Sequence, residues 1–491
     1  VASGLTLIFG IMGVINLAHG SLYMVGAYAA AFAAAQTGSF VIAVLAGLAA
    51  GYVAADGAGI VPGPFTTAEP WPTPEPFPSP SLTSPLVLPA VLPDPFPGAP
   101  LPTAAGLQGA LDSLLAAPEL GTPAGVLVVD LATGEPIIGA YEGLARKPAS
   151  TTKVLTAAAA VATLDLAATL PTTTVLTGTD EVILIGGGDI ALAAGAGDPS
   201  AVVGRAGLGD LAAATAAALT DRGLTSVTVR MDDSLFGGST QAQGWSSIDF
   251  TGGFVAPIHP LGINVGLIEG RDQRDTDPAA GAAAVFAQAL RDNGIEVRDW
   301  SLRTRGRAGS VELARVRPAP RRPPPAPSWP DSGTMLTEVL GRLVAIAAGE
   351  PATFEGAATA TLAAIAGLGV DVSGTVLNDA SGLSSNNRIS PKLLTDLLVK
   401  GATDPALRPL AVSLPVAGLE GTLSERNLDD GQVRAKTGTL PGVVSLAGYT
   451  VTADGRAVVF AVMADGVPPA GSYAARIEID EWVRTLTACG C

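Results

Sequence analysis

Residues 149–160 read Ala149-Ser150-Thr151-Thr152-Lys153-Val154-Leu155-Thr156-Ala157-Ala158-Ala159-Ala160. The downstream run consists of strong helix formers, so the stretch predicts a helix that opens at Ser150. Residues three apart share a helix face, and the Lys153 amine can therefore reach the Ser150 hydroxyl. A lysine can remove the hydroxyl proton if burial lowers its pKa towards neutrality. The stretch predicts a nucleophile and its base, and the alternative is a helix N-cap followed by an exposed lysine.

A second lysine of the five in the chain stands in an equally informative context. Lys436 begins the triplet Lys436-Thr437-Gly438, which is followed by Thr439 and precedes the apolar run 443–451. Alone, this triplet is a turn at a strand end. Ser-x-x-Lys with a downstream Lys-Thr-Gly on an edge strand is, however, the constellation of penicillin-binding proteins and serine β-lactamases. There the strand pairs with an extended substrate, the Lys and Thr hold its terminal carboxylate, and the Gly permits close approach.

On these motifs, residues 103–491 resemble the low-molecular-mass class C penicillin-binding proteins, which are D-Ala-D-Ala carboxypeptidases and endopeptidases. The resemblance implies an α/β (α+β) transpeptidase fold, with an antiparallel sheet between helices. It places a catalytic domain at 103–170 and 330–491, and one or more inserted domains at 171–316. Other segments that match the family pattern are Gly186-Gly187-Gly188-Asp189, Asp379-Ala380-Ser381-Gly382-Leu383-Ser384 with Asn387-Arg388, Leu414-Pro415-Val416-Ala417-Gly418 with Gly421-Thr422-Leu423, and Cys489-Gly490-Cys491.

Hydrophobic periodicity independently predicts a sheet built from both ends of this body. Two apolar runs flank a turn near its start, and two more flank a turn near its end, so each pair reads as a hairpin. A helix precedes the first hairpin and another follows the second. The expected elements are a helix at 104–116, strands at 124–130, 136–141, 443–451 and 456–464, and a helix at 472–488.

The family's second motif, Ser-x-Asn, is altered in this chain. Alignment on Met335-Leu336-Thr337-Glu338 gives Ser332-Gly333-Thr334, so Thr334 stands where the family has Asn. The preceding residues 317–330 are rich in proline, which disfavours the helix expected there. The two explanations are a short frame error in the DNA and a real degeneration that leaves a weak enzyme. Ser384-Ser385-Asn386 is an alternative Ser-x-Asn, although its flanks match another family segment.

The resemblance assigns each motif a role in acyl transfer at the D-Ala-D-Ala end of peptidoglycan stem peptides. Ser150 attacks and Lys153 takes its proton, while the backbone amides of Ser150 and Thr439 form the oxyanion hole. Lys436 and Thr437 bind the terminal carboxylate, and Ser332 assists protonation of the leaving D-Ala. No cofactor or metal is expected, and β-lactams are expected to acylate Ser150.

The N-terminal region differs in character from the body. Residues 1–55 carry no charged side chain and are mostly apolar, which predicts one or two membrane segments, at about 4–35 and 40–55. Residues 4–28 resemble an early segment of branched-chain amino acid permeases, with Asn16 and His19 as polar positions on a helix. No later apolar span follows, so we interpret this region as a fusion or a gene-model artefact. Residues 56–102 are a proline-rich linker.

Composition excludes several other classes of protein. The net charge is −16, which argues against nucleic acid as a partner. Two histidines and two terminal cysteines make a zinc cluster or a disulfide scaffold improbable. The expected location is the outer face of the cell membrane, anchored by the N-terminal segment. Two competing hypotheses are a penicillin-binding pseudoenzyme that turns over slowly and, from another class, an amino-acid transporter subunit.

Overall fold

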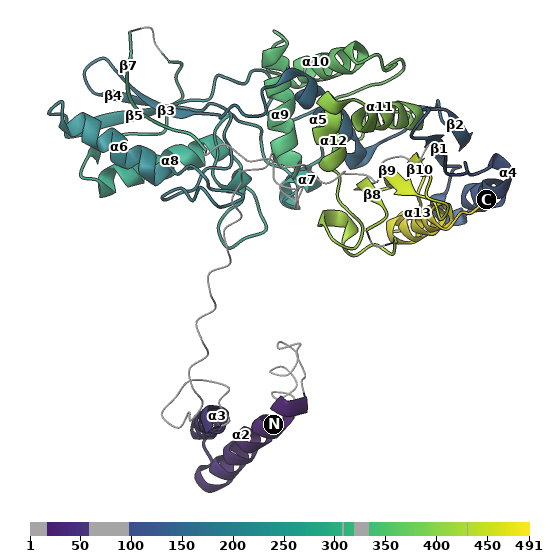
Figure 1. The fold of residues 1–491 in the computed structure, drawn as a ribbon. Helices are drawn as coiled ribbons and strands as arrows, with labels where there is room; N and C mark the ends of the chain where they lie inside the picture. Colours follow the sequence, from purple (N-terminus) through teal and green to yellow (C-terminus); the bar gives the residue numbers. More distant parts are fainter. Residues whose placement is uncertain (1–16, 58–97, 307–308, 319–332, 430) are drawn as a thin grey trace, which may run out of the picture. The chain divides into compact units, whose positions relative to one another are not determined.

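The computed structural model describes residues 17–57, 98–306, 309–318, 333–429 and 431–491 (Figure 1). Residues 1–87 and 88–491 form two separate compact units. The first contains helices α2 (Leu17–Thr37) and α3 (Phe40–Gly57), which pack against each other. Among the described residues, no helix meets the combined length and apolarity that a membrane crossing requires. Asn16 and most of the proline-rich linker lie outside the described residues.

A five-stranded antiparallel sheet joins the two ends of the second unit, as the hairpin pattern predicts. Its central pairing is β1 against β10, in which Val128 lies opposite Phe460. The strand β8 forms one edge, so one side of its backbone has no strand partner in this sheet. In spatial order the strands are β2 (Pro136–Ala140), β1 (Gly125–Asp130), β10 (Ala457–Ala464), β9 (Val443–Val451) and β8 (Arg434–Leu440).

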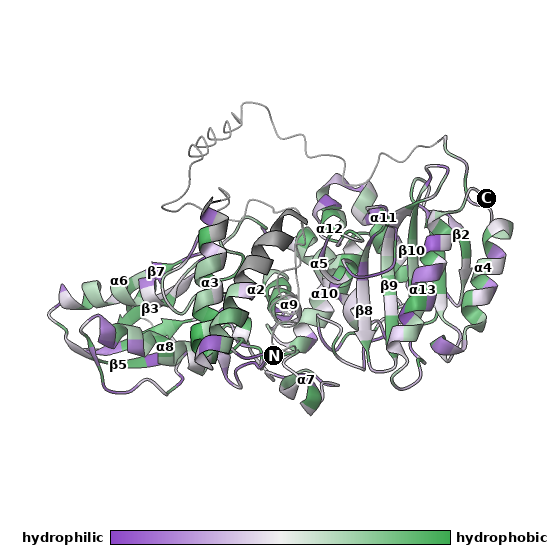
Figure 2. Cartoon of the chain, turned by 90° about the horizontal axis from the view of Figure 1, so that it is seen from below, coloured by the Kyte–Doolittle hydropathy of each residue, from purple (hydrophilic) through white to green (hydrophobic). Residues whose placement is uncertain are grey.

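Alternate residues of these strands enter two different hydrophobic cores. Val126 and Val128 pack with α4 (Ala104–Ala116) and α13 (Ser472–Thr487), which lie side by side on one face (Figure 2). Leu127 and Val129 pack on the opposite face with α5 (Thr152–Thr163), α11 (Pro391–Thr403) and α12 (Arg408–Val412). This period-two alternation is what a sheet covered on both faces requires. It also fixes α5, which follows Ser150, against the sheet that carries β8.

The chain between α5 and α9 (Gly333–Ala347) builds a second five-stranded sheet, which is mixed rather than antiparallel. Strand β4 pairs in parallel with β5, and β5 in parallel with β6, whereas β3 is antiparallel to β4 and β7. Helices α6 (Leu208–Thr220) and α8 (Pro278–Asp292) cover it. The strands are β3 (Thr172–Thr177), β4 (Glu181–Ile185), β5 (Ser226–Asp232), β6 (Glu296–Val297) and β7 (Val311–Val316).

Two further helices stand beside α5. Helix α9 contacts α5 and α10 (Phe354–Gly367), and α10 also contacts α5. Their shared core is built almost entirely from alanines, such as Ala159, Ala345 and Ala360. Because small side chains let helix axes approach closely, the N-terminal end of α9 is held near the start of α5. A short helix α7 (Ser247–Thr251) precedes a loop that returns towards this helix cluster.

Candidate active site

Ser150 lies in a single 3-10 turn, Ala149–Thr151, directly before α5. The α-helix itself begins at Thr152, two residues later than the sequence pattern predicts. The Lys153 ammonium nitrogen, Nζ, donates a hydrogen bond of 2.9 Å to Ser150 Oγ and another of 2.9 Å to the Ser381 carbonyl. The structure therefore brings together the two residues predicted to act as nucleophile and base.

Burial makes Lys153 a usable base near neutral pH. Loss of hydration lowers the pKa of Lys153 to about 8, against the opposing effect of the Asp379 and Glu338 carboxylates. Neither carboxylate forms an ion pair with Lys153 among the described contacts. A neutral amine in hydrogen-bond contact with a hydroxyl is the arrangement that general-base activation requires.

The loop at residues 379–384 positions Lys153 and is itself held by two carboxylates. Glu338 in α9 accepts hydrogen bonds from the backbone amides of Ala380 (3.1 Å) and Ser381 (2.8 Å). Asp379 accepts from the Gly382 amide at 2.9 Å and from Trp245 Nε1 at 2.8 Å. Burial and the nearby Asp379 charge raise the pKa of Glu338 to about 8. Sequence reasoning used Glu338 only as an alignment landmark and missed this positioning role.

A close backbone contact explains the glycine in this loop. Gly382 has φ +86°, and a Cβ there would stand 1.8 Å from the Ala149 carbonyl oxygen. Only glycine accommodates both the left-handed conformation and the contact. Ala149, immediately before the nucleophile, has φ 47°, which is unusual for a residue with a side chain. The turn that presents Ser150 is thus held in a strained conformation by the loop packed on it.

Strand β8 supplies the third motif beside the nucleophile. Burial, and secondarily the charge of Lys153, lower the pKa of Lys436 to about 7. Lys436 Nζ donates to the Thr437 carbonyl at 2.9 Å, and the Thr437 and Thr422 hydroxyl oxygens are 2.7 Å apart. A Cβ at Gly438 would lie 2.7 Å from the Pro148 carbonyl oxygen, so glycine lets β8 approach the turn that precedes Ser150.

The second motif is represented by Gly333 and Thr334, because Ser332 lies outside the described residues. Thr334 is the second residue of α9 and lines the same cavity as Ser150 and Lys153. In the alternative motif, by contrast, the buried Ser384 hydroxyl donates to the Gln243 carbonyl at 2.6 Å. None of Ser384-Ser385-Asn386 lines the cavity. The geometry favours Thr334 and its neighbours as the second motif.

A cavity of about 280 Å³ connects these groups. Four of its lining residues are basic and none of those described is acidic, in a chain whose net charge is −16. The sequence did not single out three of the lining residues, because their neighbourhoods carry no motif: Phe254, Arg426 and Arg476. Thr422 stands in Gly421-Thr422-Leu423, which matches the family pattern but was given no role. The complete lining is Ser150, Lys153, Phe254, Gly333, Thr334, Thr422, Arg426, Lys436, Thr437, Thr439 and Arg476.

The two arginines in the lining are held differently. Arg426 is buried and forms an ion pair with Asp480 in α13. Arg476, also on α13, stacks over the Tyr473 ring at 5.0 Å and has no ion-pair partner among the described residues. Arg426 thus fixes the wall of the cavity, whereas the Arg476 guanidinium remains available to an anion.

Comparison with protein families agrees with this geometry. The model of the D-Ala-D-Ala carboxypeptidase 3 (S13) family matches residues 107–277 and 271–486. The chain belongs to this family. Its S13 motifs, Ser150-x-x-Lys153 and Lys436-Thr437-Gly438, are those on which the resemblance to class C penicillin-binding proteins rests. A second model, for a branched-chain amino acid transport permease component, matches residues 1–61, in agreement with the resemblance of that region.

Individual relatives extend over most of the S13 body. Carboxypeptidase DacB of Mycolicibacterium smegmatis is 38% identical over 84% of this chain and 89% of its own length. A D-alanyl-D-alanine carboxypeptidase from an Actinomadura species is 29% identical over 73% of this chain and 81% of its own. The crystal structure of penicillin binding protein 4 from Haemophilus influenzae matches with a TM-score of 0.62 at 21% identity, covering 78% of this chain and 99% of that one. The last comparison establishes a shared fold.

Proposed function

We propose that this S13 protein is a serine D-Ala-D-Ala carboxypeptidase that acts on peptidoglycan stem peptides through an acyl-enzyme. The observation that carries the proposal is the 2.9 Å hydrogen bond between Lys153 Nζ and Ser150 Oγ, within a cavity lined by basic residues. The half-buried Lys153 amine, with a pKa of about 8, serves as the base. A cationic cavity suits a substrate that ends in a free carboxylate.

The proposed reaction has two covalent steps. Ser150 Oγ attacks the carbonyl carbon between the two D-Ala residues, and its proton passes to Lys153. Backbone N–H groups of Ser150 and Thr439 stabilise the oxyanion, and the C–N bond then breaks. The terminal D-Ala leaves as an amine after receiving a proton, a step assisted by Ser332. Water then attacks the ester and regenerates the Ser150 hydroxyl.

Strand β8 provides the proposed substrate platform. It lies at the sheet edge, where Arg434 and Ala435 pair with the segment at Pro415 and Val416, and an extended peptide can add along the strand beyond them. Thr437, Lys436 and Arg476 then surround the terminal carboxylate. Because the guanidinium recognises a free carboxylate, we propose carboxypeptidase rather than endopeptidase action.

This assignment is tested on a short acyl-D-Ala-D-Ala peptide and its C-terminal amide. Arg476→Ala should raise KM for the free acid roughly tenfold, since a hydrogen bond to a charged group is lost. The ratio of kcat/KM for the free acid to kcat/KM for the amide should fall by a similar factor. Arg484→Ala, also on α13 but outside the cavity, is the matched control. Release of D-Ala from the acid that persists in Ser150→Ala would contradict the whole proposal.

A second candidate function rests on Thr334. A Thr hydroxyl cannot donate and accept as an Asn carboxamide does, so the protein would bind penicillin covalently yet turn over peptide slowly. Comparison of penicillin labelling with steady-state release of D-Ala separates this pseudoenzyme from the enzyme. Fast labelling with no D-Ala release would favour the pseudoenzyme.

We further propose that residues 103–170 and 330–491 form the catalytic domain, with 171–316 inserted. Action outside the cytoplasm is supported by the disulfide between Cys489 and Cys491, because such bonds persist in oxidising compartments. Anchoring by residues 1–55 is proposed from their lack of charged side chains. Fractionation of cells that express the full chain or residues 102–491 tests the anchoring, since only the full chain should sediment with membranes.

A further inference from the structure

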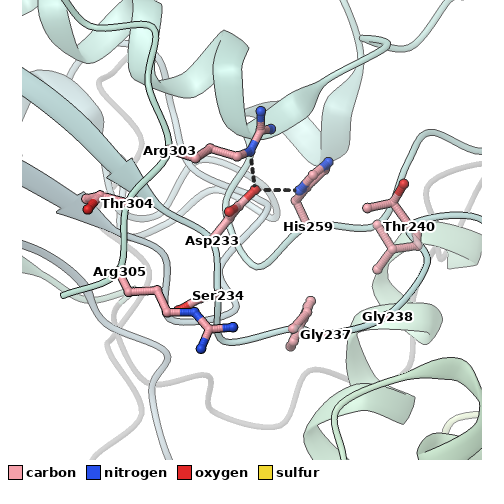
Figure 3. A pocket seen from close by; sticks show the side chains of 11 residues that line it. Asp233, Ser234, Gly237, Gly238, Thr240, His259, Arg303, Thr304 and Arg305 are labelled. Atoms are coloured by element: carbon pink, nitrogen blue, oxygen red, sulfur yellow. Dashed lines mark hydrogen bonds and ion pairs between the residues drawn. The ribbon is translucent and has the colours of Figure 1, made fainter.

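A second cavity, of about 520 Å³, lies beyond strand β5 and apart from the catalytic motifs. Figure 3 shows its charged side chains converging from three segments of the chain. We call it the Arg303 pocket. It is lined by Asp233, Ser234, Phe236, Gly237, Gly238, Thr240, Ile258, His259, Arg303, Thr304 and Arg305.

Most charges of the Arg303 pocket satisfy one another. Arg303 donates to Asp233 at 2.8 Å and to Asp277 at 2.6 Å, and His259 Nδ1 lies 2.9 Å from Asp233 Oδ2. Although burial raises it, hydrogen bonds from His259 and Arg303 hold the pKa of Asp233 down at about 2. The other ring nitrogen of His259 faces Asp277 at 3.8 Å, so no hydroxyl is activated. This cluster is a rigid clamp rather than a catalytic triad.

Arg305 is different from its neighbour. Its exposed guanidinium has no hydrogen bond or ion pair within the part of the chain that the structure describes, and it points into the pocket (Figure 3). Its backbone is held on both sides: the Thr304 amide donates to the Met231 carbonyl at 2.9 Å, and the Gly306 amide to Asp232 at 2.5 Å. A cation on a fixed backbone, with no partner of its own, is arranged to receive an anion.

The remaining lining offers hydroxyl groups over an apolar floor. The hydroxyls of Ser234, Thr240 and Thr304 make no hydrogen bond to any other described group. Beneath them lie the buried side chains of Phe236 and Ile258. Hydroxyls beside an aromatic ring suit a polar, partly apolar ligand such as a sugar or a peptide. One free guanidinium matches a single carboxylate better than a dianionic phosphate.

The Arg303 pocket is joined to the catalytic cavity by one short loop. Phe254 lines the catalytic cavity, and Ile258 and His259 line the pocket. Four residues span at most about 14 Å, so the two cavities are close enough to contact one polymer. The Ile258 amide donates to the Thr240 carbonyl at 2.8 Å, which fixes this loop to the pocket wall.

We propose that the Arg303 pocket is a second binding site for peptidoglycan, which holds a carboxylate-bearing glycan–peptide segment through Arg305. The segment is distinct from the D-Ala-D-Ala end that enters the catalytic cavity. The proposal rests on the proposed function for its choice of polymer. It implies that the protein recognises the cell-wall polymer at two places at once and so retains it while Ser150 reacts.

The test is equilibrium binding to the full chain of a disaccharide–peptide fragment of peptidoglycan that lacks both D-Ala residues. Arg305→Glu should weaken binding at least about tenfold, because a charge-assisted hydrogen bond becomes a repulsion. Conversion of the fragment's carboxylates to amides should weaken binding to the natural chain by a similar factor, and should strengthen binding to the variant because the repulsion from Glu is removed. Arg408→Glu, at an exposed arginine on α12 that lines neither cavity, changes the net charge by the same amount and is the control.

Three outcomes overturn the proposal: equal binding by Arg305→Glu, equal sensitivity of both proteins to amidation, and tighter binding of a glycerol-phosphate polymer than of the fragment. The thermal midpoint of Arg305→Glu checks its folding, since the exposed side chain has no partner among the described residues to lose. Failure of the proposed function is recognised separately, because the fragment carries no D-Ala and its binding requires no hydrolysis.

Discussion

In the catalytic cavity, Lys153 and Lys436 are half-buried with no carboxylate in direct contact, whereas in the Arg303 pocket Arg303 lies between two aspartates. Burial consequently lowers the pKa of Lys153 to about 8 and that of Lys436 to about 7. The pKa of Arg303 is instead raised, chiefly by its hydrogen bond to Asp277. An unpaired, half-buried cation is ready to exchange a proton, and a paired one is fixed in place. The catalytic cavity is therefore suited to proton transfer, and the Arg303 pocket to holding a ligand in place.

The largest effect is expected from removal of the nucleophile. Ser150→Ala should lower the rate of acylation by labelled penicillin by at least about 10³-fold, because no other serine hydroxyl contacts a lysine among the described hydrogen bonds. Mass spectrometry of peptides from the penicillin-labelled natural chain should locate the penicilloyl adduct on Ser150. Ser385→Ala, in the alternative Ser-x-Asn motif, is the control and should label normally. An adduct on another serine would show that Ser150 is not the nucleophile and that this cavity is not the catalytic one.

The next effect is the pH dependence of acylation. Neutral Lys153 is the active base, so protonation below its pKa of about 8 should reduce the penicillin acylation rate roughly fiftyfold between pH 8 and pH 6. Asp379→Asn should shift this limb to lower pH, since the Asp379 charge raises the pKa of Lys153. Lys392→Met removes an exposed, ion-paired lysine and should leave the profile unchanged. A flat profile in the natural chain would show that Lys153 is not the titrating base.

A smaller effect concerns the side of the cavity formed by α9. Replacing residues 317–334 by an apolar helix that ends in Ser-Asp-Asn should raise acylation at least about tenfold, because an amide replaces the shorter Thr334 hydroxyl. A matched replacement that keeps Thr334 separates the amide from the helix. A stably folded variant with no gain would show that Ser332-Gly333-Thr334 is not the second motif. Ser384-Ser385-Asn386 would then return as the candidate.

The smallest effect is expected from truncation. A chain that begins at Pro102 should be acylated by penicillin within about twofold of the full chain, because both cavities are lined only by residues beyond 149. Thr103 stays in place, with its amide donating to the Cys491 carbonyl at 2.8 Å. Aggregation of the truncated chain, or loss of labelling, would show that the N-terminal unit contributes to the catalytic body.

Local sequence signals predicted what lies within one turn or one strand. The three-residue spacing of Ser150 and Lys153 predicted their contact, and the apolar run at 443–451 predicted β9 with the bounds that the structure shows, Val443–Val451. Both hairpins and the terminal helices are confirmed within a residue or so at their ends. Such features depend on neighbours in the chain and need no knowledge of the remainder.

Contacts between distant segments escaped prediction. Glu338 accepts a hydrogen bond from the Ala380 amide, 42 positions away, and no pattern in either segment predicts this contact. Arg476 appears in the sequence as one charged position of an amphipathic helix, and only the packing of α13 places it in the cavity. The parallel pairing of β4 with β5 was also unforeseen, because a crossover of 40 residues separates strands with no distinctive turn. Tertiary packing decides these features.

The pairing of β1 with β10 determines when, during synthesis of the chain, the catalytic sheet can form. Asp130 and Arg456, which form a buried ion pair at the end of these strands, are 326 positions apart. At about 5–20 residues per second, a ribosome needs roughly 16–65 s to travel between them. For most of that interval Ser150 has been synthesised but β8, β9 and β10 have not. A nascent chain should therefore not react with penicillin until about the last eighth of the chain, which begins with β8, is made.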